Sequence, residues 1–329
     1  MKKRIFIAVL VCMAIMAANC LASDATPAHG SDSAKVYVDR ARELANARKL
    51  DEALSAFDKA IAFDSSYEDA WRGKGAVLWM QDHQNEALVA TDKAIQLKAD
   101  DVKAWLNKGR IYLRMGKNED ALHTFEHVSI MDPKNEDALM GRFATLRDLK
   151  RTDEMLTTLD KLIELKPEDS ERWLRKGMEA AEAGKFDTAL TAFDLLTKMH
   201  PDSAVYWVGK GQCLAGLQRF PEALSALDKA TTMAPGLGDA WNIKGTVQSK
   251  AQKLDDAIVS YNKAIELEPK FAEATYNRAC AYALKGDKAK ALADLKTAIA
   301  SDVSIKFVAI KDDDLKSLRD DPEFKKLTE

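Results

Sequence analysis

The sequence repeats itself with an unbroken period of 34 residues. Of eight consecutive segments, seven carry an alanine at the same place, and the fourth carries Met155 there. The alanines are Ala53, Ala87, Ala121, Ala189, Ala223, Ala257 and Ala291. A fixed period of this length is typical of a solenoid, in which each unit buries its apolar face against its neighbours. We therefore expect one continuous stack of similar units rather than several globular domains.

Three further columns keep the same register. Tryptophan recurs as Trp71, Trp105, Trp173, Trp207 and Trp241. Glycine follows four residues later as Gly75, Gly109, Gly177, Gly211 and Gly245. Proline closes most units as Pro133, Pro167, Pro201, Pro235 and Pro269. Because side chains at i and i+4 share a helix face, each Trp and Gly together form a knob beside a hollow. Proline cannot continue a helix, so it separates one unit from the next.

This combination of columns resembles the tetratricopeptide repeat family. The resemblance covers residues 34–305 as eight repeats without an insertion. It implies an all-α fold, a right-handed superhelical solenoid of antiparallel helix pairs. The repeats begin at Ala34, Glu68, Val102, Glu136, Ser170, Ala204, Gly238 and Ala272.

The fourth repeat departs from the pattern at three places. Leu139 replaces the tryptophan, Phe143 the glycine and Met155 the alanine. A single small-to-large change at a helix crossing costs about 1–3 kcal/mol, but here the lost tryptophan leaves room for Phe143. The two interpretations are a repacked repeat and a local docking point for a partner.

The first residues are typical of a secretory signal peptide. Lys2, Lys3 and Arg4 precede an apolar run and small residues up to Ala22, which predicts cleavage there. An uncleaved anchor and a lipoprotein acylated at Cys20 remain alternatives. Residues 23–33 have the composition of a flexible leader. We expect an exported protein, either periplasmic, secreted or on the cell surface.

Residues 306–329 leave the period and resemble the closing segment of many proteins of this family. Leu315, Leu318 and Phe324 are expected to cover the last repeat, because a solenoid needs a polar-faced cap. The acidic run 312–314 lacks the alternating spacing of a calcium loop and fits a helix N-terminus better.

Charge and cysteine content narrow the function further. Cleavage would remove Lys2, Lys3 and Arg4 and take the net charge from −3 to about −6. Nucleic-acid binding needs a basic surface, so we expect no nucleic-acid partner. Outside the signal only Cys213 and Cys280 remain, two repeats apart, and we expect both to be buried and unbridged.

One catalytic motif is present by sequence. His123 and His127 match the H-x-x-E-H pattern of a zinc protease. Phe125 between them occupies a core place, which directs both histidines outward. We therefore expect no catalytic residue, no metal and no cofactor, and keep a metal-binding or hydrolytic protein using His123 and His127 as an alternative.

The resemblance implies a function in binding. In this family the first helices of successive repeats line a concave groove that holds peptides or helices. The residues that this places in the groove are Arg72, Trp79, Lys103, Leu106, Asn107, Arg110, Arg114, Met140, Leu174, Arg175 and Met178, with Gln212 and Asn242 farther along. Trp79 lies outside the tryptophan column, so it either serves as an interface residue or packs against the neighbouring repeat.

Our first hypothesis is an exported, non-catalytic scaffold that binds a peptide or helical segment of a protein partner in this groove. The basic residues near Trp79 favour an acidic or mixed segment. A self-assembling structural protein of the cell envelope is a further alternative, because stacked repeats can associate end to end.

Overall fold

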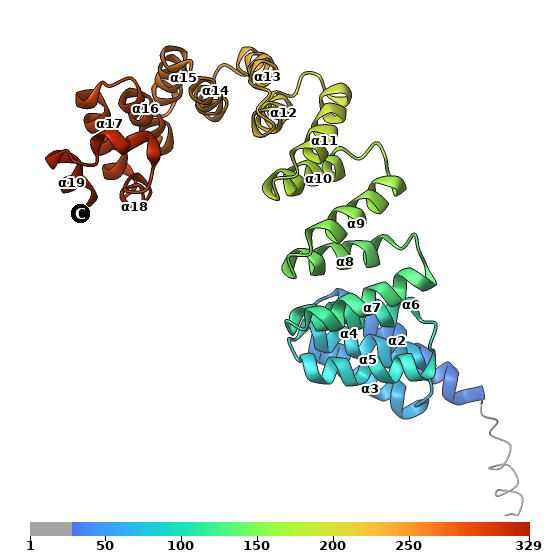
Figure 1. Cartoon of the computed structure of the whole chain (residues 1–329). Coiled ribbons are helices and arrows are strands. Elements are labelled where there is room, and N and C mark those ends of the chain that lie inside the picture. Colours follow the sequence, from blue (N-terminus) through green and yellow to red (C-terminus); the bar gives the residue numbers. More distant parts are fainter. Residues whose placement is uncertain (1–27) are drawn as a thin grey trace, which may run out of the picture. The chain divides into compact units, whose positions relative to one another are not determined.

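The computed structural model describes residues 28–329, which form paired helices without a strand among them (Figure 1). The expected signal, residues 1–22, and the first part of the leader lie outside the described residues. The first helices of the repeats are α2 (Ala28–Asn46), α4 (Glu68–Met80), α6 (Val102–Arg114), α8 (Glu136–Asp148), α10 (Ser170–Glu182), α12 (Ala204–Gly216), α14 (Gly238–Lys250) and α16 (Ala272–Leu284). The second helices are α3 (Leu50–Phe63), α5 (Gln84–Leu97), α7 (Asn118–Met131), α9 (Thr152–Leu165), α11 (Phe186–Met199), α13 (Phe220–Met233), α15 (Leu254–Leu267) and α17 (Lys288–Ser301). The all-α solenoid of helix pairs is confirmed.

Helix α2 begins earlier than its repeat. Residues 28–33, expected in the leader, form the first turns of this helix. Gly30 lies beside the end of α3, where a methyl group on it would come within 3.1 Å of the carbonyl oxygen of Phe63. The extra turns of α2 therefore contact α3, the second helix of the same repeat.

The turn within each repeat follows one backbone design. A single residue adopts a left-handed conformation after each first helix, with φ between 58° and 81°. It is glycine at Gly116, Gly184 and Gly286, and a larger residue in the other repeats. The next amide then bonds back into the helix, as when His83 N donates to Leu78 O at 2.9 Å. This is the helix-ending motif that glycine accommodates best, so the larger residues there carry a small conformational cost.

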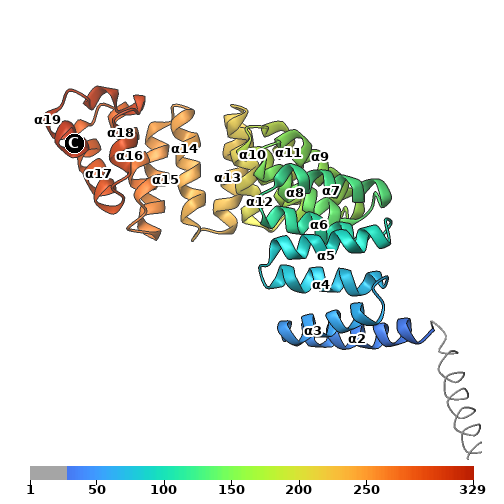
Figure 2. The same ribbon diagram turned by 90° about the horizontal axis from the view of Figure 1, so that it is seen from below.

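The described residues form two compact units, unit 1 up to residue 162 and unit 2 over residues 163–329, each of which we describe by itself. In unit 1, α2, α4, α6 and α8 contact one another in succession, and in unit 2 the same holds for α10, α12, α14 and α16. Contacts between second helices of successive repeats are fewer. Figure 2 shows the stacking of α2 to α6 in unit 1. We call the surface formed by the first helices the inner face of each unit.

The predicted core columns are buried as expected. Every alanine of the marker column is fully buried, and Met155 is 3% exposed. Each tryptophan of its column is half-buried, and its indole N–H donates to a backbone carbonyl six residues earlier, at 2.8–3.0 Å. The acceptors are Ser65, Ala99, Pro167, Pro201 and Pro235. The tryptophan therefore fastens the turn between repeats in addition to filling space.

A second regularity, with a period of two repeats, was not predicted. The rings of Phe57, Phe125 and Phe193 each lie against a glycine in the first helix of the following repeat. Those glycines are Gly73, Gly141 and Gly209, where a methyl group would approach the ring to 2.2–2.4 Å. In the intervening repeats the ring is replaced by Thr91, Leu159 and Leu227, and the glycine by Asn107, Arg175 and Ile243. From the second to the seventh repeat, a side chain therefore stands at this place of the inner face only in alternate repeats.

The fourth repeat keeps its three departures inside the protein. Leu139 and Phe143 are each 2% exposed and Met155 is 3% exposed. Leu139 has no indole N–H, so the tryptophan-to-turn hydrogen bond is lost there. Burial of all three side chains favours the interpretation as a repacked repeat over that of a docking point.

The C-terminal segment folds as α18 (Ile305–Ala309), a 3-10 helix η1 (Asp313–Leu318) and α19 (Pro322–Thr328). Leu315, Leu318 and Phe324, which we expected to cover the last repeat, are buried in one cluster with residues of α16 and α17. The Tyr276 hydroxyl donates to Asp312 Oδ2 at 2.5 Å, and this bond ties α16 to the segment before η1.

Both cysteines of the described chain are buried and unbridged, as predicted. Burial and the nearby Asp194 carboxylate raise the pKa of Cys213 to about 12, which leaves it a neutral thiol.

No helix in residues 28–329 has the length and apolar character needed to cross a membrane.

Candidate binding surfaces

Ion pairs join the charged side chains on the inner face of unit 1. Arg42 bonds Asp69 at 3.0 Å. Arg72 bonds both Asp69 and Asp101, so these residues of α2, α4 and the turn before α6 form one chain of alternating charge. Arg72 is only 17% exposed and Asp101 6% exposed. Arg72, expected to meet a partner, is thus committed to a partly buried network.

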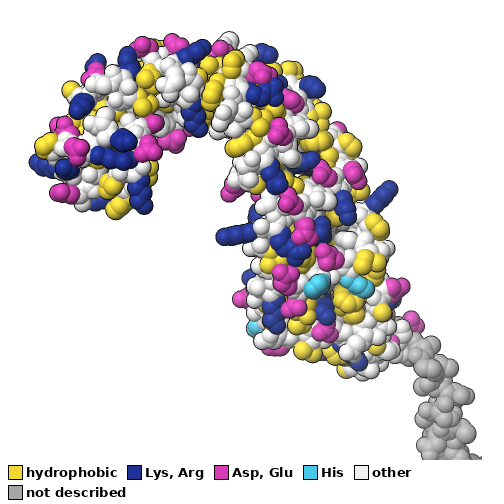
Figure 3. All heavy atoms as spheres, in the orientation of Figure 1, with side chains coloured by type: hydrophobic (Ala, Val, Ile, Leu, Met, Phe, Trp, Pro, Cys, Tyr) yellow, Lys and Arg dark blue, Asp and Glu magenta, His cyan; other side chains and the backbone are white. Residues whose placement is uncertain are grey.

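The other arginines of this face also have carboxylate partners. Arg110 bonds Asp137 at 3.2 Å, and Arg114 bonds Asp82 at 3.0 Å. Lys103 is exposed. Figure 3 shows acidic and basic side chains interspersed over the surface in view. The expected preference for an acidic segment is therefore weakened, because most cations on this face are already neutralised locally.

Trp79 packs between repeats. Its half-buried ring contacts a cluster that includes Leu78, Ala87 and Ile111, and the guanidinium of Arg114 lies 5.7 Å from the ring centroid. The indole nitrogen is buried without a hydrogen-bond partner. Of the two interpretations, packing against the neighbouring repeat fits these contacts.

Leu106 is a correction to the predicted groove. It is 5% exposed and packs with Ala121, Phe125 and Val128, so its side chain belongs to the core. The reason is local: it faces the second helix of its own repeat. Asn107 is half-buried and lines a shallow hollow with Arg72 and Met80, and Met140 is 39% exposed.

Most of the predicted residues of unit 2 are exposed. Met178 is 59% exposed, Arg175 is exposed and Leu174 is half-buried on α10. Gln212 is exposed, whereas Asn242 is 3% exposed.

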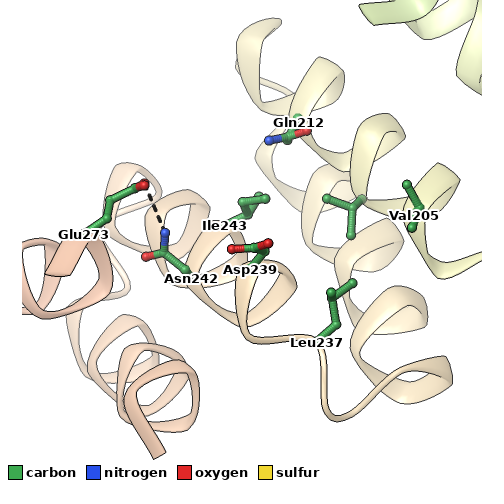
Figure 4. A pocket seen from close by; sticks show the side chains of 8 residues that line it. Val205, Gln212, Leu237, Asp239, Asn242, Ile243 and Glu273 are labelled. Carbon is green, nitrogen blue, oxygen red and sulfur yellow. Dashed lines mark hydrogen bonds between the residues drawn. The ribbon is translucent and has the colours of Figure 1, made fainter. Parts of the chain in front are cut away.

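A pocket opens on the inner face of unit 2 between α12, α14 and α16 (Figure 4). Its apolar side is formed by Val205, Val208, Leu237 and Ile243, and its polar side by Gln212, Asp239, Asn242 and Glu273. Val205 is 59% exposed, so its apolar side chain is open to solvent at the pocket. The pocket thus offers apolar surface and hydrogen-bonding groups side by side.

Amide groups hold the polar side of the pocket in place. The Asn242 amide donates to Glu273 Oε1 at 3.1 Å, and the Asn277 amide donates to Asn242 Oδ1 at 3.0 Å. Figure 4 shows Asp239 and Glu273 on either side of Asn242. Neither carboxylate has an ion-pair partner among the described residues.

Sequence reasoning missed Val205, Asp239 and Glu273. All three occupy the second place of a first helix, the same place as Lys103, which the sequence assigns to the groove. The sequence did contain one signal for this site. Val205 is an apolar residue at a solvent-facing place near the start of a helix, where the other repeats carry polar residues.

The histidine pair lies on the outer side of α7. His123 is exposed, and the ring of His127 packs on Trp105 with 4.2 Å between ring centroids. Phe125 between them is 1% exposed, as the sequence predicted. In residues 28–329 no cluster of three or more histidine, cysteine, aspartate or glutamate side chains has an arrangement able to hold a metal ion.

Models of the tetratricopeptide repeat match much of the chain. One covers residues 38–102 and 174–237, a second covers 102–135 and 272–302, and a model described as TPR repeat covers 249–286. They leave 136–173 unmatched, which is the stretch of the irregular fourth repeat. No curated protein matches the chain.

Solved structures with a similar fold include Naa15/Naa10 bound to HypK-THB, with a TM-score of 0.61 and 13% identity over 90% of this chain and 50% of that chain. A tetratricopeptide repeat protein from Parabacteroides merdae ATCC 43184 aligns with a TM-score of 0.47 and 16% identity, over 75% of this chain and 98% of that one. YrrB, described as a TPR protein with an unusual peptide-binding site, aligns with a TM-score of 0.37 and 22% identity, over 67% of this chain and 95% of that one. At these identities the likeness concerns the fold.

Proposed function

We propose, from the premise that the chain belongs to the tetratricopeptide repeat family, that it is a non-catalytic scaffold that binds a protein partner on the inner face of unit 2. The pocket between α12, α14 and α16 is the observation that carries this proposal. It combines exposed apolar side chains with fixed amides and carboxylates, a combination suited to an extended or helical peptide segment.

The contrast with unit 1 supports the choice of unit 2. On unit 1 the arginines are bonded to neighbouring carboxylates, and Trp79 and Leu106 are engaged in packing. On unit 2, Met178 and Val205 are each 59% exposed on successive first helices, whereas Met80 on α4 and Met140 on α8 of unit 1 are 47% and 39% exposed. Apolar surface left open to water is the main source of binding free energy for a partner.

We assign no catalytic role to His123 and His127. Their side chains lie on either side of a buried phenylalanine, and His127 is engaged with Trp105. A surface of this kind provides no enclosed site in which a water or substrate would be activated.

Site-directed photo-crosslinking tests the proposed function. A photoreactive amino acid is placed at Val205 on the inner face, and in a control chain at Val259 on α15, which is 66% exposed. The two sites match in residue type and exposure and differ in the face they occupy. We expect a discrete crosslinked partner from Val205 only. Equal crosslinking from both sites, or crosslinking from Val259 only, would refute the assignment.

We further propose that the protein is exported through residues 1–22. Mass spectrometry of the protein from cells that export it should give a chain beginning at Ser23. A chain that retains residues 1–22 would show an uncleaved anchor. A lipid-modified chain beginning at Cys20, abolished by Cys20→Ser, would show a lipoprotein.

A further inference from the structure

We infer that the pocket of unit 2 selects a partner segment that presents a lysine or arginine side chain beside an apolar one. This inference rests on the proposed function and specifies its ligand. It reverses the charge preference expected from the basic residues around Trp79.

Two carboxylates stand at this pocket without a cation. Asp239 and Glu273 are both exposed at the starts of α14 and α16, and both line the pocket. Neither forms an ion pair within residues 28–329. In unit 1, by contrast, Asp69, Asp101 and Asp137 each bond an arginine. The difference leaves unit 2 with acidic groups free to meet a partner.

The position of one carboxylate is fixed before any partner binds. Asn242 is buried and donates to Glu273, while Asn277 donates to Asn242 from the neighbouring first helix. A carboxylate that is already oriented loses little conformational freedom on binding. Glu273 is therefore suited to accept a directional hydrogen bond from an ammonium or guanidinium group.

Apolar surface next to these carboxylates defines the second half of the ligand. Figure 4 shows Leu237 and Ile243 near Asp239, with Val205 across the pocket. A segment that covers this surface also removes water from Asp239 and Glu273. An uncompensated carboxylate in that setting is costly, so a neutral or acidic segment is disfavoured and a cationic one is favoured.

Selection from a displayed library of random peptides against the full chain tests the ligand class. We expect enriched sequences with lysine or arginine next to an aliphatic or aromatic residue. Enrichment of acidic sequences, or of apolar sequences without a cation, would overturn the inference while leaving peptide binding intact. Absence of any enrichment would count against the proposed function itself.

Matched carboxamide variants then locate the charge. The most enriched peptide, labelled with fluorescein, is titrated against Glu273→Gln and Asp239→Asn, with Glu168→Gln as the control. Glu168 is an exposed carboxylate of the turn before α10 and does not line the pocket. We expect about tenfold weaker binding for each pocket variant and unchanged binding for the control. The carboxamide oxygen introduced by Glu273→Gln can still accept the hydrogen bond from Asn242, so the fold is retained. Equal affinities for all three variants would overturn the inference.

Discussion

The guanidinium of Arg114 lies over the ring of Trp79, with 5.7 Å between the guanidinium carbon and the ring centroid. The two residues belong to successive first helices, α6 and α4. Arg114 also bonds Asp82 at 3.0 Å, so the arginine holds the tryptophan and the turn after α4 together. The one tryptophan outside the repeat column therefore joins two repeats.

Trp79→Ala should destabilise unit 1 and leave partner binding in place. Loss of a half-buried ring that contacts Leu78 and Ile111 is expected to cost about 2 kcal/mol. Trp79→Phe should cost less, because it keeps an aromatic ring and removes a buried N–H that has no acceptor. Chemical denaturation followed by circular dichroism measures both. A fully stable Trp79→Ala that no longer binds the selected peptide would restore Trp79 as a binding residue.

Arg72→Ala should also act on stability. Its removal leaves the nearly buried Asp101 carboxylate without its cation, for an expected cost of about 1–3 kcal/mol. Arg72→Ala combined with Asp101→Asn should recover part of this loss, because Asn still accepts from the amides of Lys103 and Ala104. Arg110→Ala is the comparison, since its exposed pair should contribute at most about 1 kcal/mol. Equal losses for Arg72→Ala and Arg110→Ala would contradict the network.

Gly209→Ala should destabilise unit 2 by about 1–3 kcal/mol, because a methyl group there would lie 2.3 Å from the Phe193 ring. Gly236→Ala is the control, since a methyl at that glycine meets nothing within 4 Å. In a double-mutant cycle, Phe193→Leu should relieve part of the cost of Gly209→Ala. Strictly additive costs would show that the ring and the glycine do not constrain each other.

Removing one acidic charge from the C-terminal segment should stabilise it. Asp314 is exposed, but partial loss of its solvation, together with the Asp312 and Asp313 carboxylates, raises the pKa of Asp314. The charged form is therefore disfavoured in the folded state, and the penalty is present above the folded pKa and disappears below the unfolded pKa of about 4. Asp314→Asn should raise the melting temperature near pH 7, with the gain fading as the solution is acidified. A gain that grows toward low pH would contradict this account.

The control for that measurement is Asp313→Asn. Asp313 is 92% exposed and bonds Arg319 at 3.2 Å. Its removal relieves part of the repulsion on Asp314 but also removes the exposed bond to Arg319, so the melting temperature should change less than in Asp314→Asn.

Much of the fold could be predicted because packing repeats in register. Ala53 and its counterparts are fully buried, and the tryptophans stand at the turns between repeats. Each such position is fixed by neighbours at a constant sequence distance, so one period describes them all. The pairing of Phe125 with Gly141 was missed because such a pairing recurs only in every second repeat and joins two adjacent repeats.

The candidate site was predicted less well, because it depends on which charges neutralise one another. Arg72 and Arg110 suggested an acidic partner by sequence, yet Asp101, in the turn before α6, pairs with Arg72, and Asp137, in the next repeat, pairs with Arg110. Leu106 followed the family's groove position but packs inward. Glu273 is left without a cation, a property that only the arrangement of neighbouring helices reveals.

Amide hydrogen exchange of the full chain, with and without the selected peptide, tests most directly whether the partner binds on the inner face of unit 2. The account predicts slower exchange in α12, α14 and α16 and unchanged exchange in α4 and α6. Protection of α4 and α6 with none in α12, α14 and α16 would contradict it.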